Sequence, residues 1–290
     1  MTWYERMNSA IDYIEKNLCN EIDFDIIAKI VCQSPVSFQR TFSIVTDMSV
    51  FEYIRKRKMT LAAFDLQSNS TKVINVSFKY GYESPESFTR AFKDVHGVSP
   101  SKAKRYGLPL KAFPRITFLL SIKGDAVMEY RIENKEAFSI YGIEGIFTME
   151  EDKNLKDIPM FWQECVKDGR FDKLLKSTKD PSKGVHAICS YRETGGNTFP
   201  YMIFAYCTND CNTEGFTKVE VPAATWAIFK TEEHTREQTS EVIQSLVKRV
   251  YTDWLPTAAY KKIDGYELEL YFDSDNEKYY EETWIMVKPK

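Results

Sequence analysis

A stretch of nine residues recurs fifty positions later in this chain of 290 residues. Residues 34–42, SPVSFQRTF, align without a gap with residues 84–92, SPESFTRAF. Over the longer segments 34–50 and 84–100, eight of seventeen positions are identical. Because a repeat at a fixed spacing indicates one supersecondary unit used twice, the first third of the chain is expected to hold two copies of one fold.

Each copy has the pattern of a helix, a tight turn and a second helix. In the second copy, apolar residues at helical spacing precede Gly81, which tolerates the positive φ of a turn. Ser84 and the proline after it suit the N-cap and first position of a helix over residues 85–95. The first copy predicts the same kind of helix over residues 35–45, with Cys32 in the turn where glycine is easier.

The outward faces of the two second helices carry side chains suited to DNA. Arg and Gln form paired hydrogen bonds with base edges, and Ser, Thr and Lys contact phosphates or bases. A helix of this kind reads the major groove through its N-terminal half. A solvated surface is the alternative for Arg40 and Arg90, which recur at one place in the repeat. The candidate DNA-binding residues are Val36, Ser37, Gln39, Arg40, Glu86, Ser87, Thr89, Arg90 and Lys93.

A helix predicted over residues 50–67 joins the two copies. The basic run at its start, residues 55–58, can contact phosphate or remain solvated. The net charge of the whole chain, −3, does not itself indicate a nucleic-acid binder. Residues 1–107 hold 15 Lys and Arg against 12 Asp and Glu, whereas residues 108–290 hold 24 against 30. A mildly basic front and an acidic rear indicate different partners for the two parts.

Over residues 5–107 the chain resembles the AraC/XylS family of transcription regulators. The strongest matching stretches are residues 74–93, INVSFKYGYESPESFTRAFK, and residues 97–100, GVSP. The resemblance implies two recognition helices that enter adjacent major-groove segments of double-stranded DNA. By position it implies base-edge contacts from Val36, Gln39, Arg40, Glu86, Thr89 and Arg90. The sequence departs from the family pattern at Cys32, at Ser77 and in residues 102–105.

The rear of the chain changes from helical patterns to strands separated by two helices. The expected strands are residues 128–133, 138–148, 185–192, 201–207, 216–231, 267–272 and 283–287, and the expected helices are residues 159–168 and 236–255. The order β-α-β-β occurs twice, which predicts two pseudo-symmetric units packed into an α+β domain with a cleft between them.

The predicted chain is therefore multidomain. An all-α tandem helix-turn-helix domain is expected over residues 1–107 and an α+β domain over residues 126–290. Residues 108–125 contain prolines and an apolar, strand-like run, residues 116–122. We expect this segment to be a linker that docks against another part of the protein.

Several aromatic side chains of the rear domain are candidates for lining the cleft: Trp162, Tyr206, Trp226, Tyr271 and Trp284. Alternation along residues 266–271 places Glu267, Glu269 and Tyr271 on one strand face. A carboxylate among aromatic rings binds a cation by charge and by cation–π attraction. Core packing of the rings, with Glu269 on a solvated strand face, is the alternative.

Residues 126–290 resemble the GyrI-like ligand-binding domain. The resemblance rests on residues 221–229, VPAATWAIF, 254–256, WLP, 266–271, YELELY, and 283–287, TWIMV. It implies a pocket for small, often hydrophobic and cationic compounds, with Glu269 as its strand carboxylate, although Met286 stands where proline is usual.

The fusion of the two domains resembles the Rob type of regulator. It predicts a sequence-specific transcription regulator, and not an enzyme, whose partners are double-stranded DNA and a small hydrophobic or cationic effector of the multidrug kind. RNA polymerase is a further candidate partner. Two alternatives stay open for the rear domain: a hydrolase of reactive small molecules, or a protein-interaction module.

The six cysteines are scattered, and none forms a Cys-x-x-Cys pair. Cys207 and Cys211 could chelate a metal but lack a second pair nearby, so reduced thiols, no metal and no cofactor are expected. No apolar run approaches the ~18 residues of a membrane span. The charged N-terminus is unlike a signal peptide, so we expect a cytoplasmic protein without a membrane partner.

Overall fold

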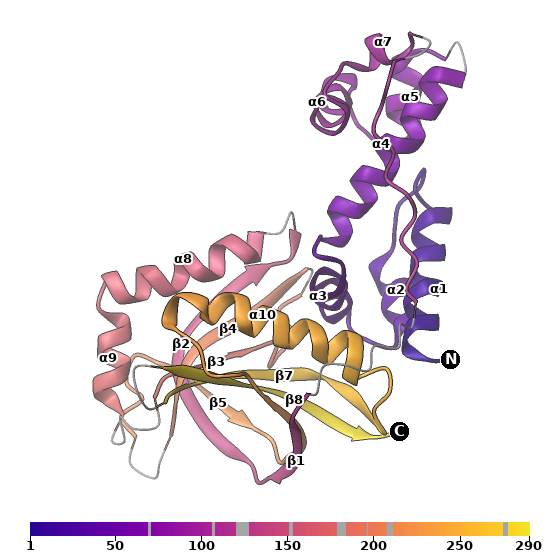
Figure 1. Cartoon of the computed structure of the whole chain (residues 1–290). Helices are drawn as coiled ribbons and strands as arrows, with labels where there is room; N and C mark the ends of the chain where they lie inside the picture. The colour runs from indigo at the N-terminus through magenta and orange to yellow at the C-terminus, as the bar shows by residue number, and fades with distance from the viewer. Residues whose placement is uncertain are drawn as a thin grey trace. The chain divides into compact units, whose positions relative to one another are not determined.

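The computed structural model describes residues 1–68, 71–105, 108–119, 128–150, 153–178, 184–195, 197–207, 211–274 and 278–290 (Figure 1). The chain divides into two compact units, residues 1–38 with 48–121 and residues 39–47 with 122–290. No helix within the described ranges is long and apolar enough to cross a membrane.

The chain is helical as far as residue 103. The helices are α1 (Trp3–Lys16), α2 (Phe24–Val31), α3 (Pro35–Thr46), α4 (Val50–Ser68), α5 (Val73–Lys79), α6 (Pro85–His96) and α7 (Pro100–Ala103). The helices predicted for the repeat and for its connection are confirmed as α3, α4 and α6. Side-chain caps explain where several of them begin: Thr2 forms a capping box with Glu5, and Asp23 and Ser84 accept backbone N–H groups of α2 and α6.

The second copy of the repeat has its own apolar core. Phe88 and Phe92 of α6 are fully buried and pack with Met59 of α4 and Val76 of α5. Their rings lie 5.6 Å apart, centroid to centroid. Burial of two phenyl side chains supplies much of the apolar area that holds α4, α5 and α6 together.

In the first copy, α2 buries Ile27 and Val31, whereas Ile26 is 39% exposed. The turn after α2 has the predicted left-handed conformation, with Cys32 at a φ of 56° where Gly81 has 78° in the second copy. A side chain is strained in this region, so Cys32 destabilises its turn relative to glycine.

The segment after α7 docks along the helices of its own unit. Asn8 of α1 donates to the Phe118 carbonyl and accepts from the Phe118 N–H, both at 2.8 Å. The Phe118 ring meets the Trp3 ring edge to face at 5.9 Å, and the Phe113 N–H donates to Thr60 at 3.0 Å. Residues 108–119 thus dock against the helices as expected, although they form no strand. Residues 120–125 of the predicted linker lie outside the described residues.

The rear of the chain combines strands with helices, as predicted. The strands are β1 (Tyr130–Lys135), β2 (Phe138–Thr148), β3 (His186–Cys189), β4 (Thr198–Tyr206), β5 (Thr217–Val221), β6 (Ala224–Lys230), β7 (Tyr260–Asp273) and β8 (Tyr279–Pro289). The helical segments are α8 (Lys153–Lys167), α9 (Arg170–Ser177), η3 (Arg236–Gln238), α10 (Thr239–Arg249) and η4 (Val250–Trp254), the last with π-helical turns.

All of these strands form one sheet in the order β1-β6-β8-β7-β3-β4-β2-β5, and each neighbouring pair is antiparallel. The predicted duplication is confirmed, because β2-α8-β3-β4 and β6-α10-β7-β8 occupy the two halves and meet where β3 pairs with β7. The leading strands exchange partners: β1 pairs with β6 of the second half, and β5 pairs with β2 of the first.

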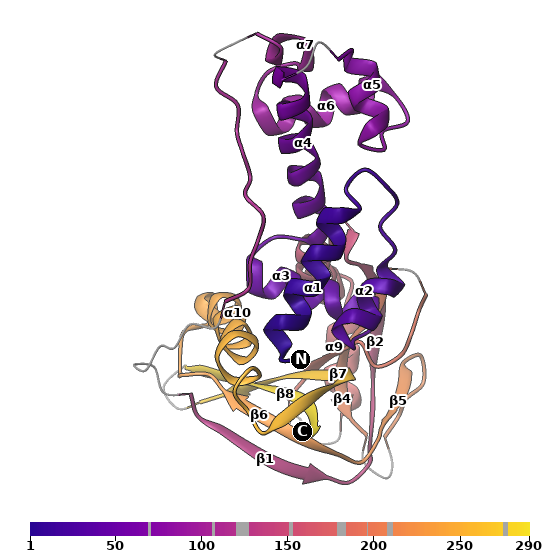
Figure 2. The same ribbon diagram turned by 90° about the vertical axis from the view of Figure 1, so that its right-hand side faces the viewer.

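Helices α8 and α10 lie on one face of this sheet, here called the helix-covered face (Figure 1). Figure 2 shows α10 on this face from a second side. Under α10, Ile243 and Leu246 pack on Ala227 and Phe229 of β6 and on Ile285 of β8. On the opposite face, a second apolar cluster joins residues of β2 to β8, among them Ile140, Ile188, Met202, Trp226, Leu268 and Trp284.

Several predicted elements have different bounds in the structure. Residues 216–231, expected as one strand, form β5 and β6 because Pro222 interrupts the ladder between them. The helix expected from Pro159 begins at Lys153 and carries Pro159 within it. Helix α9 was not predicted, and β7 and β8 extend beyond residues 267–272 and 283–287 at both ends.

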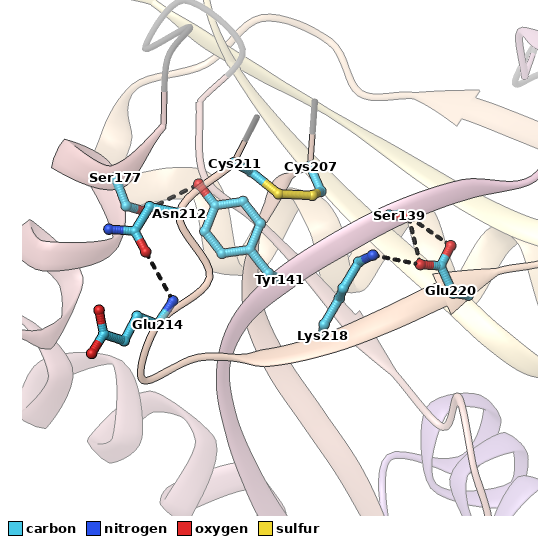
Figure 3. The surroundings of a disulfide bond; sticks show 9 residues. All are labelled: Ser139, Tyr141, Ser177, Cys207, Cys211, Asn212, Glu214, Lys218 and Glu220. Carbon is cyan, nitrogen blue, oxygen red and sulfur yellow. Dashed lines mark hydrogen bonds and ion pairs between the residues drawn. A yellow bond between two sulfur atoms is a disulfide. The ribbon is translucent and has the colours of Figure 1, made fainter. Parts of the chain in front are cut away.

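A disulfide joins Cys207, at the end of β4, to Cys211 (Figure 3). Their Cα atoms are 5.4 Å apart, and the Cys207 N–H donates to the Ser139 carbonyl on β2 at 2.9 Å. The expectation of reduced thiols at these two positions is therefore wrong. The cause is the pairing of β4 and β5 with the same strand, β2, which brings these two cysteines within bonding reach. Among the described cysteines, Cys19, Cys32, Cys165 and Cys189 are free.

Candidate functional site

Helix α6 presents the predicted recognition residues of the second copy. Ser84 caps the helix by accepting the Ser87 N–H at 3.1 Å, and Gly97 ends it in the left-handed conformation. Because Phe88 and Phe92 point into the core, the other side of the helix is turned to solvent. Glu86, Ser87, Arg90 and Lys93 are exposed there, and Thr89 is half-buried.

Helix α3 carries Val36, Ser37, Gln39 and Arg40 in the corresponding order along its first turns. Ser34 accepts the Ser37 N–H at 3.2 Å, which repeats the cap of α6. In the structure, however, Gln39 is buried and donates from Nε2 to Asn197 Oδ1 at 2.7 Å, and Arg40 Nη1 lies 3.0 Å from Glu267 Oε2. These two side chains are therefore not presented to DNA in this structure, whereas DNA contact from the half-buried Val36 and Ser37 stays a prediction.

The basic run at residues 55–58 is largely structural. Arg57 forms a bidentate pair with Glu15 of α1, with Nε and Nη2 both 2.8 Å from carboxylate oxygens. Lys56 pairs with Glu52 at 2.5 Å, and Lys58 is half-buried, which lowers its pKa. Only Arg55 of this run is exposed, so phosphate contact from the run as a whole is not favoured.

Glu269 lies near the centre of the helix-covered face of the sheet. Leu268 and Leu270, its neighbours on β7, are buried in the opposite cluster, so the predicted alternation of this strand is confirmed. The Tyr271 hydroxyl donates to Glu269 Oε2 at 3.0 Å. The structure records no ion pair between the Glu269 carboxylate and a described Lys, Arg or His.

Two aromatic residues from other elements complete a group that we call the Glu269 cluster: Glu269, Tyr271, Tyr201 and Trp162. Trp162 of α8 donates from Nε1 to the Tyr201 hydroxyl at 2.9 Å, and its ring meets the Tyr271 ring edge to face at 5.8 Å. Three of the predicted ligand residues are thus brought together. Tyr201 was missed. It pairs with Cys189 of β3, which pairs with Glu267, and this pairing between strands has no local signal in the sequence.

The other three predicted ligand residues lie on the opposite face. Trp226 and Trp284 are buried there with ring centroids 5.9 Å apart, and Tyr206 packs against the same cluster. The physical reason is alternation, because Thr283 pairs with Glu269 and Trp284, one position further, must point away. Trp226, Trp284 and Tyr206 therefore do not share a surface with Glu269.

The two carboxylates on this face of β7 have different surroundings. Glu267 Oε1 lies 2.7 Å from Lys262 Nζ and accepts from the Tyr251 hydroxyl at 3.1 Å. Burial lowers the pKa of Lys262, but the charge of Glu267 outweighs this effect and raises it. For Glu269, burial raises the pKa above its ordinary value. The positive charge of Arg40 and the Tyr271 hydrogen bond oppose this effect, and the Glu267 charge adds to it.

The described residues contain no group of three or more His, Cys, Asp or Glu side chains placed to hold a metal ion. The polar atoms of the Glu269 cluster are one carboxylate, two phenol hydroxyls and one indole N–H. Such a set can hold a small organic molecule by charge, hydrogen bonds and ring contacts.

Comparison with known proteins separates the chain into two matched regions. A family model described as an integron-associated effector binding protein matches residues 131–287, and a helix-turn-helix domain model matches residues 27–106. The solved structure of the integron cassette protein VCH_CASS2 of Vibrio cholerae is similar with a TM-score of 0.37 and 14% identity, over 55% of this chain and 95% of that one.

Two curated relatives match the front of the chain. The HTH-type transcriptional activator AarP of Providencia stuartii is 38% identical over 95 residues, which are 33% of this chain and 70% of AarP. The multiple antibiotic resistance protein MarA of Salmonella typhimurium is 33% identical over 112 residues, which are 36% of this chain and 88% of MarA.

Proposed function

Because this chain belongs to the AraC family of DNA-binding transcription regulators and carries an integron-associated effector-binding domain behind its helix-turn-helix domain, we propose that the Glu269 cluster binds its effector. The effector is a small molecule with an apolar body and a positive charge. Through this molecule the rear domain controls transcription from the site to which the front domain binds.

The observation that carries the proposal is a half-buried carboxylate that forms no ion pair with a described residue, although the charge of Arg40 acts on it. Removal of a carboxylate from water is costly unless a charge or several hydrogen bonds compensate it. Glu267, two residues away, has direct ion pairs with Lys262 and Arg40, whereas Glu269 has a hydrogen bond from the Tyr271 hydroxyl. A bound cation supplies the missing charge, and the rings of Trp162, Tyr201 and Tyr271 supply apolar and cation–π contact.

The DNA-binding part of the proposal rests on α6. Its exposed Arg90 and Lys93, with Ser87 and Glu86 on the preceding turn, form the polar surface that a helix needs in the major groove. By position in the repeat, Gln39 and Arg40 of α3 correspond to Thr89 and Arg90, but their side chains contact Asn197 and Glu267 in this structure.

The effector site is tested by charge-selective binding. Decylammonium and decanol share an alkyl chain and differ in charge, and binding of each to the full chain is followed by tryptophan fluorescence and by calorimetry. We expect Glu269→Gln to weaken decylammonium binding by about 10- to 100-fold, the size of a lost hydrogen bond to a charged group. Decanol binding should be nearly unchanged.

The matched control is Glu220→Gln, which removes an exposed carboxylate from β5 of the same domain. It should leave both affinities as in the natural protein. Equal weakening of decylammonium and decanol by Glu269→Gln would show that the carboxylate only supports the fold, and the proposal would then be abandoned.

A further inference from the structure

Thr283 of β8 carries a buried hydroxyl that the protein leaves without a partner. The residue is 5% exposed, and its Oγ1 has no hydrogen-bond partner. It faces the same side of the sheet as Glu269, because the two residues are directly paired between β7 and β8. A buried hydroxyl without a partner is costly and is uncommon in folded proteins.

The nearby polar groups of the helix-covered face are satisfied. Glu267 has Lys262 and Tyr251, and Tyr201 accepts from Trp162. One pair further along β8, Glu281 accepts from the Thr231 hydroxyl at 3.2 Å and lies 3.2 Å from His234. Unlike these groups, the Thr283 hydroxyl has no hydrogen-bond partner, and it lies beside the carboxylate proposed to bind the effector.

The juxtaposition of the two side chains defines a chemical preference. Directly paired residues of an antiparallel ladder have Cβ atoms roughly 4.5–5.5 Å apart, so one small group can touch both side chains. Tyr271 engages Glu269 Oε2, which leaves Oε1 and the Thr283 oxygen as two neighbouring acceptors. A positively charged nitrogen with two or more N–H donors can donate a hydrogen bond to each of these oxygens. A fully substituted cation has no N–H donor and can donate to neither.

We propose that Thr283 selects effectors whose cationic group bears N–H donors, such as primary ammonium or amidinium groups, over fully substituted cations. This inference rests on the proposed function of the Glu269 cluster. Thr283 is then a specificity-determining residue. Glu269 binds the positive charge of the effector, and the Thr283 hydroxyl accepts a hydrogen bond from its N–H group.

The test compares decylammonium with decyltrimethylammonium, below their critical micelle concentrations, by calorimetry on the full chain. The two ions share charge and alkyl chain and differ in N–H donors. We expect the natural protein to prefer decylammonium by about tenfold, and Thr283→Val, which replaces the hydroxyl by a methyl of similar size, to remove most of this preference. Affinity for decyltrimethylammonium should change by less than about twofold.

Two further variants keep the result interpretable. Thr283→Ser retains the hydroxyl and should retain the preference, and Thr217→Val removes an exposed threonine of β5 and should change nothing. If Thr283→Val affects both ions equally, or neither, the selectivity inference is overturned and the proposed site stands. If neither ion binds the natural protein, the proposed function itself fails, and the inference fails with it.

Discussion

Glu267 and Glu269 stand two positions apart on one strand face, yet only one of them has a lysine. Glu267 forms ion pairs with Lys262 and Arg40, which make it a structural carboxylate, whereas Glu269 forms none with a described residue and is available to a ligand. Lys262, whose side chain is 6% exposed, reaches Glu267 across the irregular register between positions 262 and 267. The bulge therefore places a cation beside Glu267 and leaves Glu269 to Tyr271.

The raised pKa of Glu269 predicts a pH dependence of stability. A carboxyl whose folded pKa lies above its ordinary value of 4.5 stabilises the fold below that value, and this contribution is lost as pH rises through the folded pKa. Without ligand, Glu269→Gln should therefore raise the free energy of unfolding at pH 7 to 8. The gain should shrink as pH falls toward 4.5, as measured by urea unfolding across this range.

Glu220→Gln is the comparison, because the pKa of Glu220 is shifted in the opposite direction. Hydrogen bonds from Ser139 and Lys218 lower the pKa of this exposed carboxyl, so its removal should give no gain at pH 7 (Figure 3). A gain for Glu269→Gln that is constant between pH 4.5 and 8 would contradict a burial effect on ionisation.

At the scale of elements, α6 is the part of the repeat whose exposed face can be tested by itself. Arg90→Ala should weaken binding to a duplex selected from a random library by about 1–3 kcal/mol if the arginine contacts a base. Electrophoretic mobility shift at two salt concentrations measures both the affinity and its salt dependence.

Arg115→Ala is the control for this DNA-binding measurement, because Arg115 is an exposed arginine of the docked linker that pairs with Asp12. It should leave affinity within error. Unchanged affinity of Arg90→Ala for the selected duplex would contradict the prediction that α6 is a recognition helix.

Much of the element order is predictable from the sequence, and the misses have physical causes. The repeat around Phe38 and Phe88 locates α3 and α6, since capping and helical spacing are local signals. Alternation along residues 266–271 gives the correct faces of β7. Spacing along one strand, however, does not say which residue of another strand is its neighbour, so Tyr201 was missed and Trp226 was placed beside Glu269.

The disulfide and α9 were missed for a related reason. Cys207 and Cys211 are four positions apart, and their approach depends on the pairing of β4 and β5 with the same strand, β2. The pairing of β5 with β2 joins residues about 80 positions apart along the chain, for example Ser139 and Glu220. No local pattern carries that information.

At the scale of the whole molecule, separate apolar cores predict separate unfolding transitions. Phe88 belongs to the core of α4, α5 and α6, and Leu268 to the core of the sheet. Phe88→Ala should cost about 3–5 kcal/mol and lower the melting temperature of one calorimetric transition, while Leu268→Ala should lower that of the other. A single transition shifted by both substitutions would contradict independent stability of the two cores.

The exchange of β1 and β5 has a consequence for how the rear domain can be built. Each β-α-β-β half receives an edge strand from the chain segment that leads into the other half. In terms of assembly, the domain corresponds to a strand-swapped homodimer whose two copies have been joined into one polypeptide. In a homodimer both copies have the same sequence, whereas the two halves of one polypeptide can differ. One half can therefore contribute Glu269 and the other Trp162 and Tyr201 to a single asymmetric site.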